Sequence, residues 1–210
     1  MIHPSEQAEP SGTDLSPRTR AKREAILDAA EKVFVAEGYA ASIDRIAAAA
    51  GVAKQTVYSH FGSKEGLFRA MAEHSKRDFA TGLQNGSDLR TALVAFGTAV
   101  LKRVLDPDTL GMQRLLIAQA ATFPDIARIF AEVGPARSAA RLADLLSKAM
   151  DDGLLMRADA TLAAEDFLGL LQGQRRLKLL FGYGEPPGEA AMLQAAERAA
   201  DVFLRAYAPG

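Results

Sequence analysis

The sequence predicts an all-α protein, and three observations support this prediction. Apolar residues recur at helical spacing along most of the 210-residue chain, whereas no segment shows the strict alternation of half-buried strands. Two short helices separated by a glycine lie near the N-terminus, and glycines, prolines and capping residues separate the later helices. We expect a disordered tail over residues 1–16, a three-helix domain with a helix-turn-helix over 17–62, and a helical body over 63–210 whose first helix, 63–81, links the two.

The order of elements follows from the expected helix ends. An apolar stripe between Ile26 and Phe34 predicts a first helix that starts near Ser16 or Arg20 and is closed by Gly38. In the body, Asp–Pro, Phe–Pro and glycine-rich segments indicate where one helix ends and the next begins. The helices expected in the body after residue 81 are 89–105, 110–121, 123–133, 135–150, 160–180 and 189–207.

The helix-turn-helix pattern occupies residues 42–67. Its first short helix places Ile43 and Ile46 on one face, and Ser42 precedes them at a position that suits an N-cap. Gly51 then supplies a turn in which a positive φ costs little only for glycine. This arrangement is typical of modules that place their second helix in the major groove of DNA.

The second helix of the motif, residues 54–61, carries polar groups on its exposed side. Val57 and Phe61 are spaced for the interior, which leaves outside the side chains of Lys54, Gln55, Thr56, Tyr58, Ser59 and His60. Such a face can donate to base edges and to phosphates, Gln to adenine and Lys to guanine. The alternative is a solvated face in an ordinary helical bundle, with Tyr58 packed on a neighbouring ring.

Four stretches of the chain resemble the DNA-binding domain of the TetR/AcrR family of transcriptional regulators. They are residues 26–39, 46–52, 56–61 and 63–68, within a match that runs from about 20 to 71. The resemblance implies a dimeric, ligand-responsive regulator of transcription, most often a repressor, that binds double-stranded operator DNA. It places Thr56, Tyr58, His60 and Lys64 against phosphates, and we add Ser42, Arg45, Lys54, Gln55 and Ser59 as further DNA contacts.

Two departures from the family pattern concern helix positioning. Ala53 occupies the place before the recognition helix where the family usually has a capping Ser or Thr, which would contribute about 1 kcal/mol. Gly66 replaces a better helix former in the first turn of the fourth helix, where it is expected to cost roughly 1 kcal/mol. We expect both changes to loosen the recognition helix without removing the motif.

The body resembles, over residues 97–182, the AefR-like C-terminal domain found in part of this family. We expect it to bind a small hydrophobic effector between its helices and to respond by moving the linking helix. The expected pocket residues are Phe96, Val100, Met112, Leu116, Gln119, Phe123, Phe130, Phe167, Leu171, Gln174 and Arg175. The alternative is that these Phe and Met stripes form plain core.

One helix-turn-helix reads only a few base pairs, so specific recognition requires two copies on a two-fold operator. The last two helices carry more apolar residues than one core obviously needs, and we assign the homodimer interface to them, unless they simply pack on the 89–105 helix. The expected interface residues are Phe167, Leu170, Leu177, Leu180, Met192, Ala195, Ala199, Val202 and Phe203.

Composition narrows the function further. The chain has no cysteine and a net charge of −1, but between residues 17 and 78 it has 11 basic against 8 acidic residues. We find no signal peptide, no membrane span, and no catalytic or metal-binding spacing, and we therefore expect no enzyme, no cofactor, no metal, no membrane partner and a cytoplasmic location. An all-helical enzyme and a helical module that binds protein rather than DNA are the alternatives.

Overall fold

A computed structural model describes residues 16–74 and 88–209. Within these ranges it contains ten α-helices, one π-helical turn and no strand, which confirms the all-α prediction. The elements are α1 (Pro17–Glu37), α2 (Ile43–Ala49), α3 (Lys54–Phe61), α4 (Lys64–His74), α5 (Leu89–Val104), α6 (Pro107–Gln119), α7 (Pro124–Ala131), η1 (Glu132–Ala136), α8 (Arg137–Asp151), α9 (Ala160–Leu180) and α10 (Glu189–Ala206).

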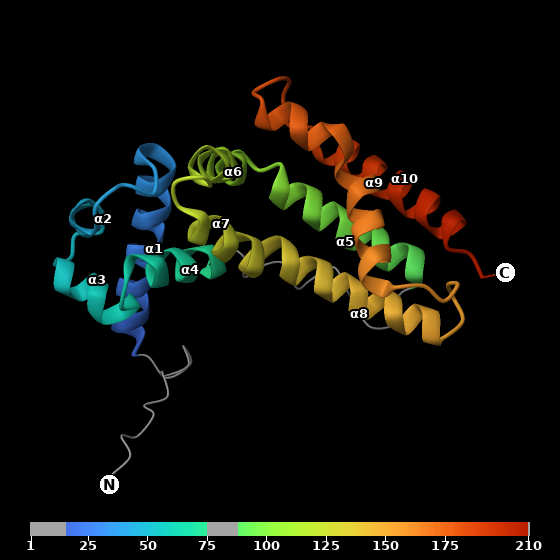
Figure 1. Cartoon of the computed structure of the whole chain (residues 1–210), viewed down its shortest axis with the longest axis horizontal. Helices are drawn as coiled ribbons and strands as arrows, with labels where there is room; N and C mark the ends of the chain where they lie inside the picture. Colours follow the sequence, from blue (N-terminus) through green and yellow to red (C-terminus); the bar gives the residue numbers. More distant parts are fainter. Residues whose placement is uncertain (1–15, 75–87, 210) are drawn as a thin grey trace, which may run out of the picture.

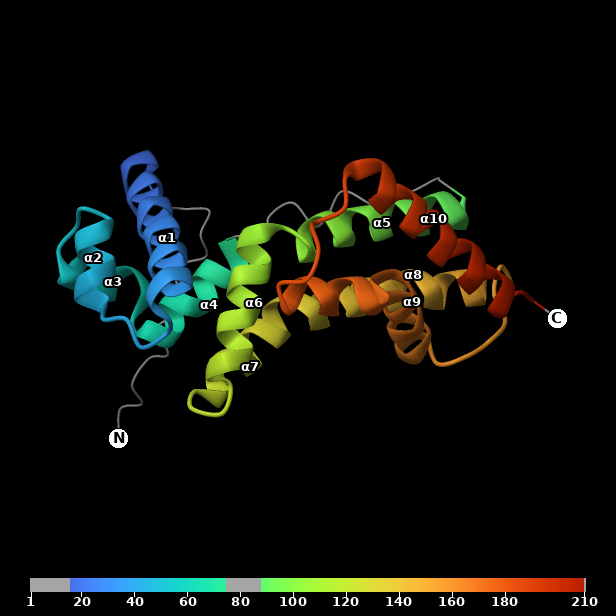
Figure 2. The ribbon, with the colours of Figure 1, turned by 90° about the horizontal axis from the view of Figure 1, so that it is seen from above.

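The helices α1–α4 form a group at one end of the molecule, which we call the head. The helices α5, α8, α9 and α10 form the body at the other end (Figure 1). In the second view, α6 lies between the head and the body (Figure 2). The C-terminus therefore lies at the end of the body that faces away from the head (Figures 1 and 2).

Two hydrophobic cores match these two groups. The first core is centred on Phe34 and Phe68 of the head, and it continues into α6 and α7 through Leu116 and Ile126. The second core joins α5 and α8–α10 around Phe167, which is fully buried. Because α6 and α7 pack into the core of the head, a displacement of either helix changes the surroundings of α1 and α4.

The predicted helix break at Pro135 is wrong. The structure instead joins α7 to α8 through the π-helical turn η1, with Pro135 inside it. Proline has no N–H and its ring collides with the carbonyl four residues earlier, and the wider π turn relieves both problems without ending the helix. The long rod in Figure 1 is this continuous α7–η1–α8 segment.

The long helix predicted over residues 160–180 is present, but it is kinked. Gly173 has φ 48° and ψ −149°, far from helical values, so α9 changes direction there.

The predicted start of the sixth helix at residue 110 is wrong. Asp106 accepts a hydrogen bond from the Thr109 backbone N–H at 3.0 Å and Pro107 occupies the first turn, so α6 begins at Pro107.

Some predictions fall outside the described residues. Helix α4 is described as far as His74, so the expected continuation to Thr81 and the loop predicted around Gln84 lie beyond the described range. The same holds for the predicted tail up to residue 15. Among the helices that the structure describes, none is long and apolar enough to cross a membrane.

Candidate nucleic-acid interface and effector cavity

The helix-turn-helix is built as its sequence predicts. The Ser42 hydroxyl accepts a hydrogen bond from the Arg45 backbone N–H at 3.2 Å and caps α2. Gly51 has φ 66° and turns the chain toward α3. Val57 is buried in the first core and Phe61 is partly buried against it, so α3 has one inner face and carries its polar residues on the outer side.

Two cationic side chains, Lys54 of α3 and Arg45 of α2, are held by neighbouring carboxylates. Lys54 Nζ donates to Asp44 Oδ2 at 2.8 Å, and this bond raises the pKa of Lys54. Arg45 Nε donates to Glu37 Oε1 at 2.8 Å. Exposed ion pairs of this kind contribute little free energy, so a phosphate can take the place of either carboxylate. Gln55 is exposed beside them.

The rest of the α3 surface is polar and accessible. Tyr58 is 39% exposed, so a large part of its side chain is accessible at this surface. The Ser59 hydroxyl donates to the Thr56 carbonyl at 2.9 Å and lies on the exposed side. Burial, and then the charges of Arg23 and Lys22, lower the pKa of His60, so its imidazole is neutral near pH 7.

Lys64, at the start of α4, is packed against an aromatic ring. Its Nζ lies 4.6 Å from the centroid of the Tyr39 ring, and partial burial lowers the pKa of its ammonium group. The Tyr39 hydroxyl donates to Glu65 Oε1 at 3.3 Å, and the Ser63 hydroxyl caps α4 by accepting from the Gly66 N–H at 2.9 Å. Lys64 is therefore positioned by the ring beneath it, at a helix N-terminus that favours anions.

The two departures from the family pattern have different outcomes. Ala53 is the N-cap of α3 and makes no side-chain cap, as the sequence predicts. Gly66, in contrast, was predicted only to weaken α4, and this prediction is incomplete. A Cβ at this position would collide with the backbone carbonyl oxygen of Phe61, so the glycine permits the close approach of α3 and α4.

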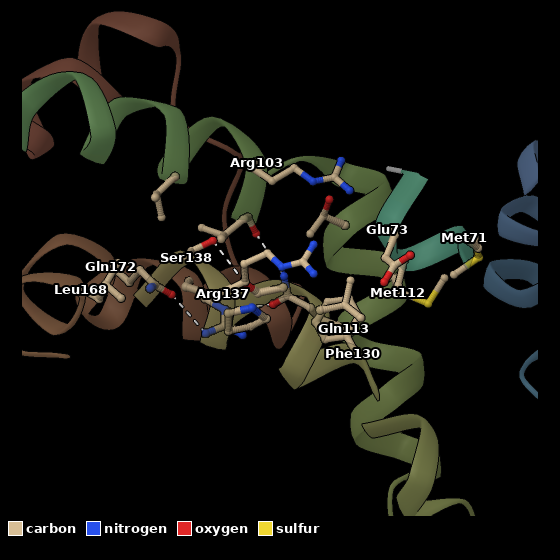
Figure 3. Close-up of a pocket in the computed structure, with 18 of the residues that line it drawn as sticks. Met71, Glu73, Arg103, Met112, Gln113, Phe130, Arg137, Ser138, Leu168 and Gln172 are labelled. Carbon is tan, nitrogen blue, oxygen red and sulfur yellow. Dashed lines mark hydrogen bonds between the residues drawn. The ribbon is translucent and has the colours of Figure 1, made fainter. Parts of the chain in front are cut away.

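A cavity of about 320 Å³ lies where the head, α6 and the body meet (Figure 3). Glu31 of α1 and Met71 and Glu73 of α4 reach it from the head. Its other walls come from α5, α6, the α7–α8 rod and α9. A ligand in this cavity would thus contact the linking helix α4 directly.

Three of the predicted pocket residues, Val100, Met112 and Phe130, line this cavity. The others do not. Phe96, Phe167 and Leu171 lie inside the second core and Leu116 inside the first, because each faces the centre of its helix packing. Gln174 and Arg175 line an exposed groove beside α10 instead, and Gln119 and Phe123 face the head.

The sequence analysis missed the polar wall of the cavity. Gln113 is only 5% exposed, and its side chain accepts a hydrogen bond from Arg176 Nε at 2.9 Å. Further polar residues that line the cavity are Arg103, Thr109, Arg137, Ser138, Arg141 and Gln172. The signal in the sequence that could have predicted this wall is Gln113, a polar residue at a core-facing position of the helix. A buried polar side chain of this kind needs a hydrogen-bond partner.

Side chains of α6, of the segment after it and of η1 contact the head. Gln119 Oε1 accepts a hydrogen bond from the Tyr39 backbone N–H at 3.0 Å. Phe123 packs edge-on against the Tyr39 ring at a centroid distance of 5.4 Å. Arg69 of α4 donates to Glu132 at 3.2 Å. These contacts hold α6 and η1, which both contribute other residues to the cavity wall, against the head.

The predicted interface residues on α9 and α10 divide into three sets by exposure. Phe167, Ala199 and Phe203 are buried within the chain. Leu170 and Leu177 are each 47% exposed. The intermediate set, partly covered by the chain itself, is Leu180, Met192, Ala195 and Val202. Phe181, just after α9, is 80% exposed and adds a further large apolar side chain to the exposed Leu170 and Leu177.

The head with its exposed α3, joined to a helical body across a shared cavity, defines a DNA-binding transcriptional regulator of the helix-turn-helix class. Comparison with known proteins agrees with this class. The profile of the bacterial regulatory proteins of the tetR family matches residues 26–71, and that of the AefR-like transcriptional repressor C-terminal domain matches residues 91–209. The chain belongs to the TetR family, a family of regulators rather than enzymes.

Particular relatives support the assignment. The chain is 33% identical over 144 residues to the transcriptional activator FasR of Mycolicibacterium smegmatis, and this match spans 63% of the chain and 61% of FasR. A TetR-family regulator from Mesorhizobium loti superposes with a TM-score of 0.78 at 28% identity, covering 92% of this chain and 100% of that one. The flavonoid-responsive regulator FrrA gives a TM-score of 0.76 at 31% identity, covering 90% and 98%.

Proposed function

We propose that this TetR-family regulator is a cytoplasmic repressor that binds a pseudo-palindromic operator as a homodimer and is released by a small effector. The observation that carries the proposal is that one cavity is lined by α1 and α4 of the head as well as by the body. A ligand there can favour one arrangement of head and body over the other. Such a difference in affinity is what a switch requires.

The DNA-binding part of the proposal is supported by the exposed face of α3. Lys54 and Gln55 open the recognition helix, where base contacts concentrate. Tyr58, Ser59 and His60 carry hydroxyl and imidazole groups at the surface, and Lys64 adds a cation at the start of α4. The proposed contact surface is completed by Ser42, Arg45 and Thr56. Ser42 lies at the N-terminus of α2, which it caps.

The dimer part is supported by the apolar surface of α9 and α10. Leu170 and Leu177 are exposed on the two parts of α9 that the kink at Gly173 separates. Phe181 follows just after the end of α9. A second copy covering these side chains would remove large apolar groups from water and set the spacing of the two recognition helices.

The effector part is supported by the mostly apolar cavity. Val100, Met112 and Phe130 provide its apolar wall, and a small molecule of matching size would bury most of its surface there. The relative FrrA is described as flavonoid-responsive, which is consistent with a small organic effector for this chain.

The test is a fluorescence anisotropy titration of the purified protein against the DNA upstream of its own gene, at several salt concentrations. We expect specific binding that weakens steeply with salt, and loss of about tenfold or more in affinity for Tyr58→Ala and Lys64→Ala. Tyr183→Ala is the matched control, because Tyr183 is 70% exposed in the loop after α9, outside the head.

Binding no stronger than to random DNA, or equal losses for the control, would refute the DNA contacts proposed above and favour a module that binds protein.

Dimerisation is tested separately by sedimentation of Leu177→Glu, which we expect to be monomeric. Ile117→Glu is its control, because Ile117 is 66% exposed on α6. A dimer that persists in Leu177→Glu would contradict the interface.

A further inference from the structure

Arg176 of α9 lies in the wall of the cavity with only neutral partners. Its Nε donates to Gln113 Oε1 at 2.9 Å, and its Nη1 donates to Gln172 Oε1 at 3.1 Å. Among the described residues no carboxylate forms an ion pair with this guanidinium. Within the described part of the chain, the charge of Arg176 is thus balanced by amide dipoles alone.

The surroundings of Arg176 make this arrangement costly for the empty protein. The guanidinium is half-buried, and burial alone lowers the pKa of Arg176, with no contribution from a nearby acid. A partly desolvated cation without a counter-charge loses hydration that neutral hydrogen bonds only partly replace. An anion that enters the cavity would supply the missing charge.

The hydrogen bonds around Arg176 also fix its orientation. The Gln113 amide nitrogen donates to the Val104 carbonyl at 3.5 Å, which turns the Gln113 oxygen toward Arg176. A guanidinium has five N–H groups, and the two amides accept from two of them. The three that are left lie on the Nη atoms, with the fork geometry that pairs with a carboxylate.

The other charges of the cavity favour the same ligand. Four arginines line it, Arg103, Arg137, Arg141 and Arg176, against two glutamates, Glu31 and Glu73. Both glutamates belong to the head, whereas Arg137 and Arg141 lie on α8. The body side of the cavity is therefore positive.

The apolar part of the cavity wall and the cavity volume indicate the shape and polarity of the rest of the ligand. Val100, Val133 and Leu168 make it apolar, together with the methionines and Phe130. Its volume of about 320 Å³ lies at the lower end of the range for small-molecule sites, roughly 300–1,000 Å³. These features suit a compact apolar group attached to one anionic end.

We propose that the cavity binds an organic carboxylate with a compact apolar body, its carboxylate paired with Arg176. This inference rests on the proposed role of the cavity as the effector site. It narrows the hydrophobic effector expected from the sequence to an acid. The apolar body lies along Val100, Met112 and Phe130, and the charged end lies against α9.

The experiment is isothermal titration calorimetry of the full chain, without DNA, with matched acid and amide pairs. The probes are octanoate with octanamide, and 3-phenylpropionate with 3-phenylpropanamide. We expect at least one acid to bind about tenfold more tightly than its amide, because a charge-assisted pair is worth at least that factor. In Arg176→Gln the preference for the acid should disappear, and Arg176→Lys should retain part of it.

Arg157→Gln is the matched control, because Arg157 is exposed and pairs with Asp151 away from the cavity. It should keep the full preference for the acid. Circular dichroism and thermal unfolding establish that each variant folds. Equal affinities for acid and amide in the wild type, no binding of any acid, or a preference that survives in Arg176→Gln would overturn the proposal. Because DNA is absent from this assay, failure of operator binding would affect the proposed function and not this result.

Discussion

The backbone N–H of Tyr39 donates a hydrogen bond to the side chain of Gln119, 3.0 Å away, across 80 residues of sequence. Tyr39 lies between α1 and α2, and Gln119 is the last residue of α6. The Tyr39 ring also lies under Lys64, the proposed phosphate contact on α4. One residue therefore connects the end of α6 with the proposed DNA-binding surface.

Replacing Gln119 with alanine should weaken this connection. We expect Gln119→Ala to lower the free energy of unfolding by about 1 kcal/mol, because a half-buried backbone N–H loses its partner. We also expect operator affinity to fall, since Tyr39 and Lys64 lose a support. Urea unfolding and anisotropy measure the two effects. Gln174→Ala, exposed on α9, should change neither by more than experimental error, and equal effects of the two would contradict the coupling.

Replacing Gly66 with alanine should destabilise the head, although alanine is the better helix former. The added Cβ would collide with the Phe61 carbonyl, and we expect a loss of about 1–3 kcal/mol in the free energy of unfolding and weaker operator binding. Gly169→Ala on α9 is the control, because a Cβ there meets nothing within 4 Å. That variant should gain up to about 1 kcal/mol from helix propensity. A stabilised Gly66→Ala would refute this reason for the glycine.

Replacing Ala53 with serine should add the missing cap of α3. Ala53 has φ −72° and ψ 146°, the extended geometry from which a serine hydroxyl accepts a hydrogen bond from the first turn. We expect the free energy of unfolding to rise by about 1 kcal/mol, measured by urea unfolding. Ala48→Ser, exposed within α2, offers no such cap and should not stabilise the protein.

Operator affinity should rise as the pH falls through the titration of His60. The pKa of His60 is lowered in the free protein, mainly by burial, and a phosphate beside it would raise it, so binding takes up a proton. We expect anisotropy titrations between about pH 8 and pH 5.5 to show this increase in the wild type and a smaller one in His60→Gln. Identical pH profiles would remove His60 from the interface.

The same group makes a separate contribution to folding stability. Because the folded-state pKa of His60 lies below its unfolded value, the unfolded chain binds more protons between the two values. This contribution is complete above the unfolded pKa and is lost as the pH falls through the folded one. Acid should therefore weaken the free protein slightly while it strengthens the complex with DNA.

Local signals in the sequence were sufficient to predict the helix-turn-helix of the head. The Ser42 cap, the turn at Gly51 and the inner position of Val57 are all present, because each depends on residues within a few positions of one another. The apolar spacing of the body also predicted its helices. Pro135 misled the prediction because its effect depends on whether a π turn can accommodate it, and the packing of η1 against α4 and α8 decides that.

The lining of the cavity could not be deduced from the sequence. Phe167 and Val100 are both apolar and both buried in the second core, yet only Val100 also lines the cavity. Helical spacing shows that a side chain faces inward, but not whether a neighbouring helix fills the space in front of it. The polar wall was missed for the same reason, since Gln113 and Arg176 are 63 residues apart.

The sequence by itself determined that this chain is an all-α TetR-family regulator with a DNA-binding head. Helical periodicity, capping and turn chemistry are local properties, and the recognition helix is a single short segment. The tertiary structure alone decided how α6 contacts Tyr39, why Gly66 is required beside Phe61, and that Arg176 lines the cavity with two glutamine side chains as hydrogen-bond partners. These features arise from distances between side chains of different helices, which depend on how the helices pack.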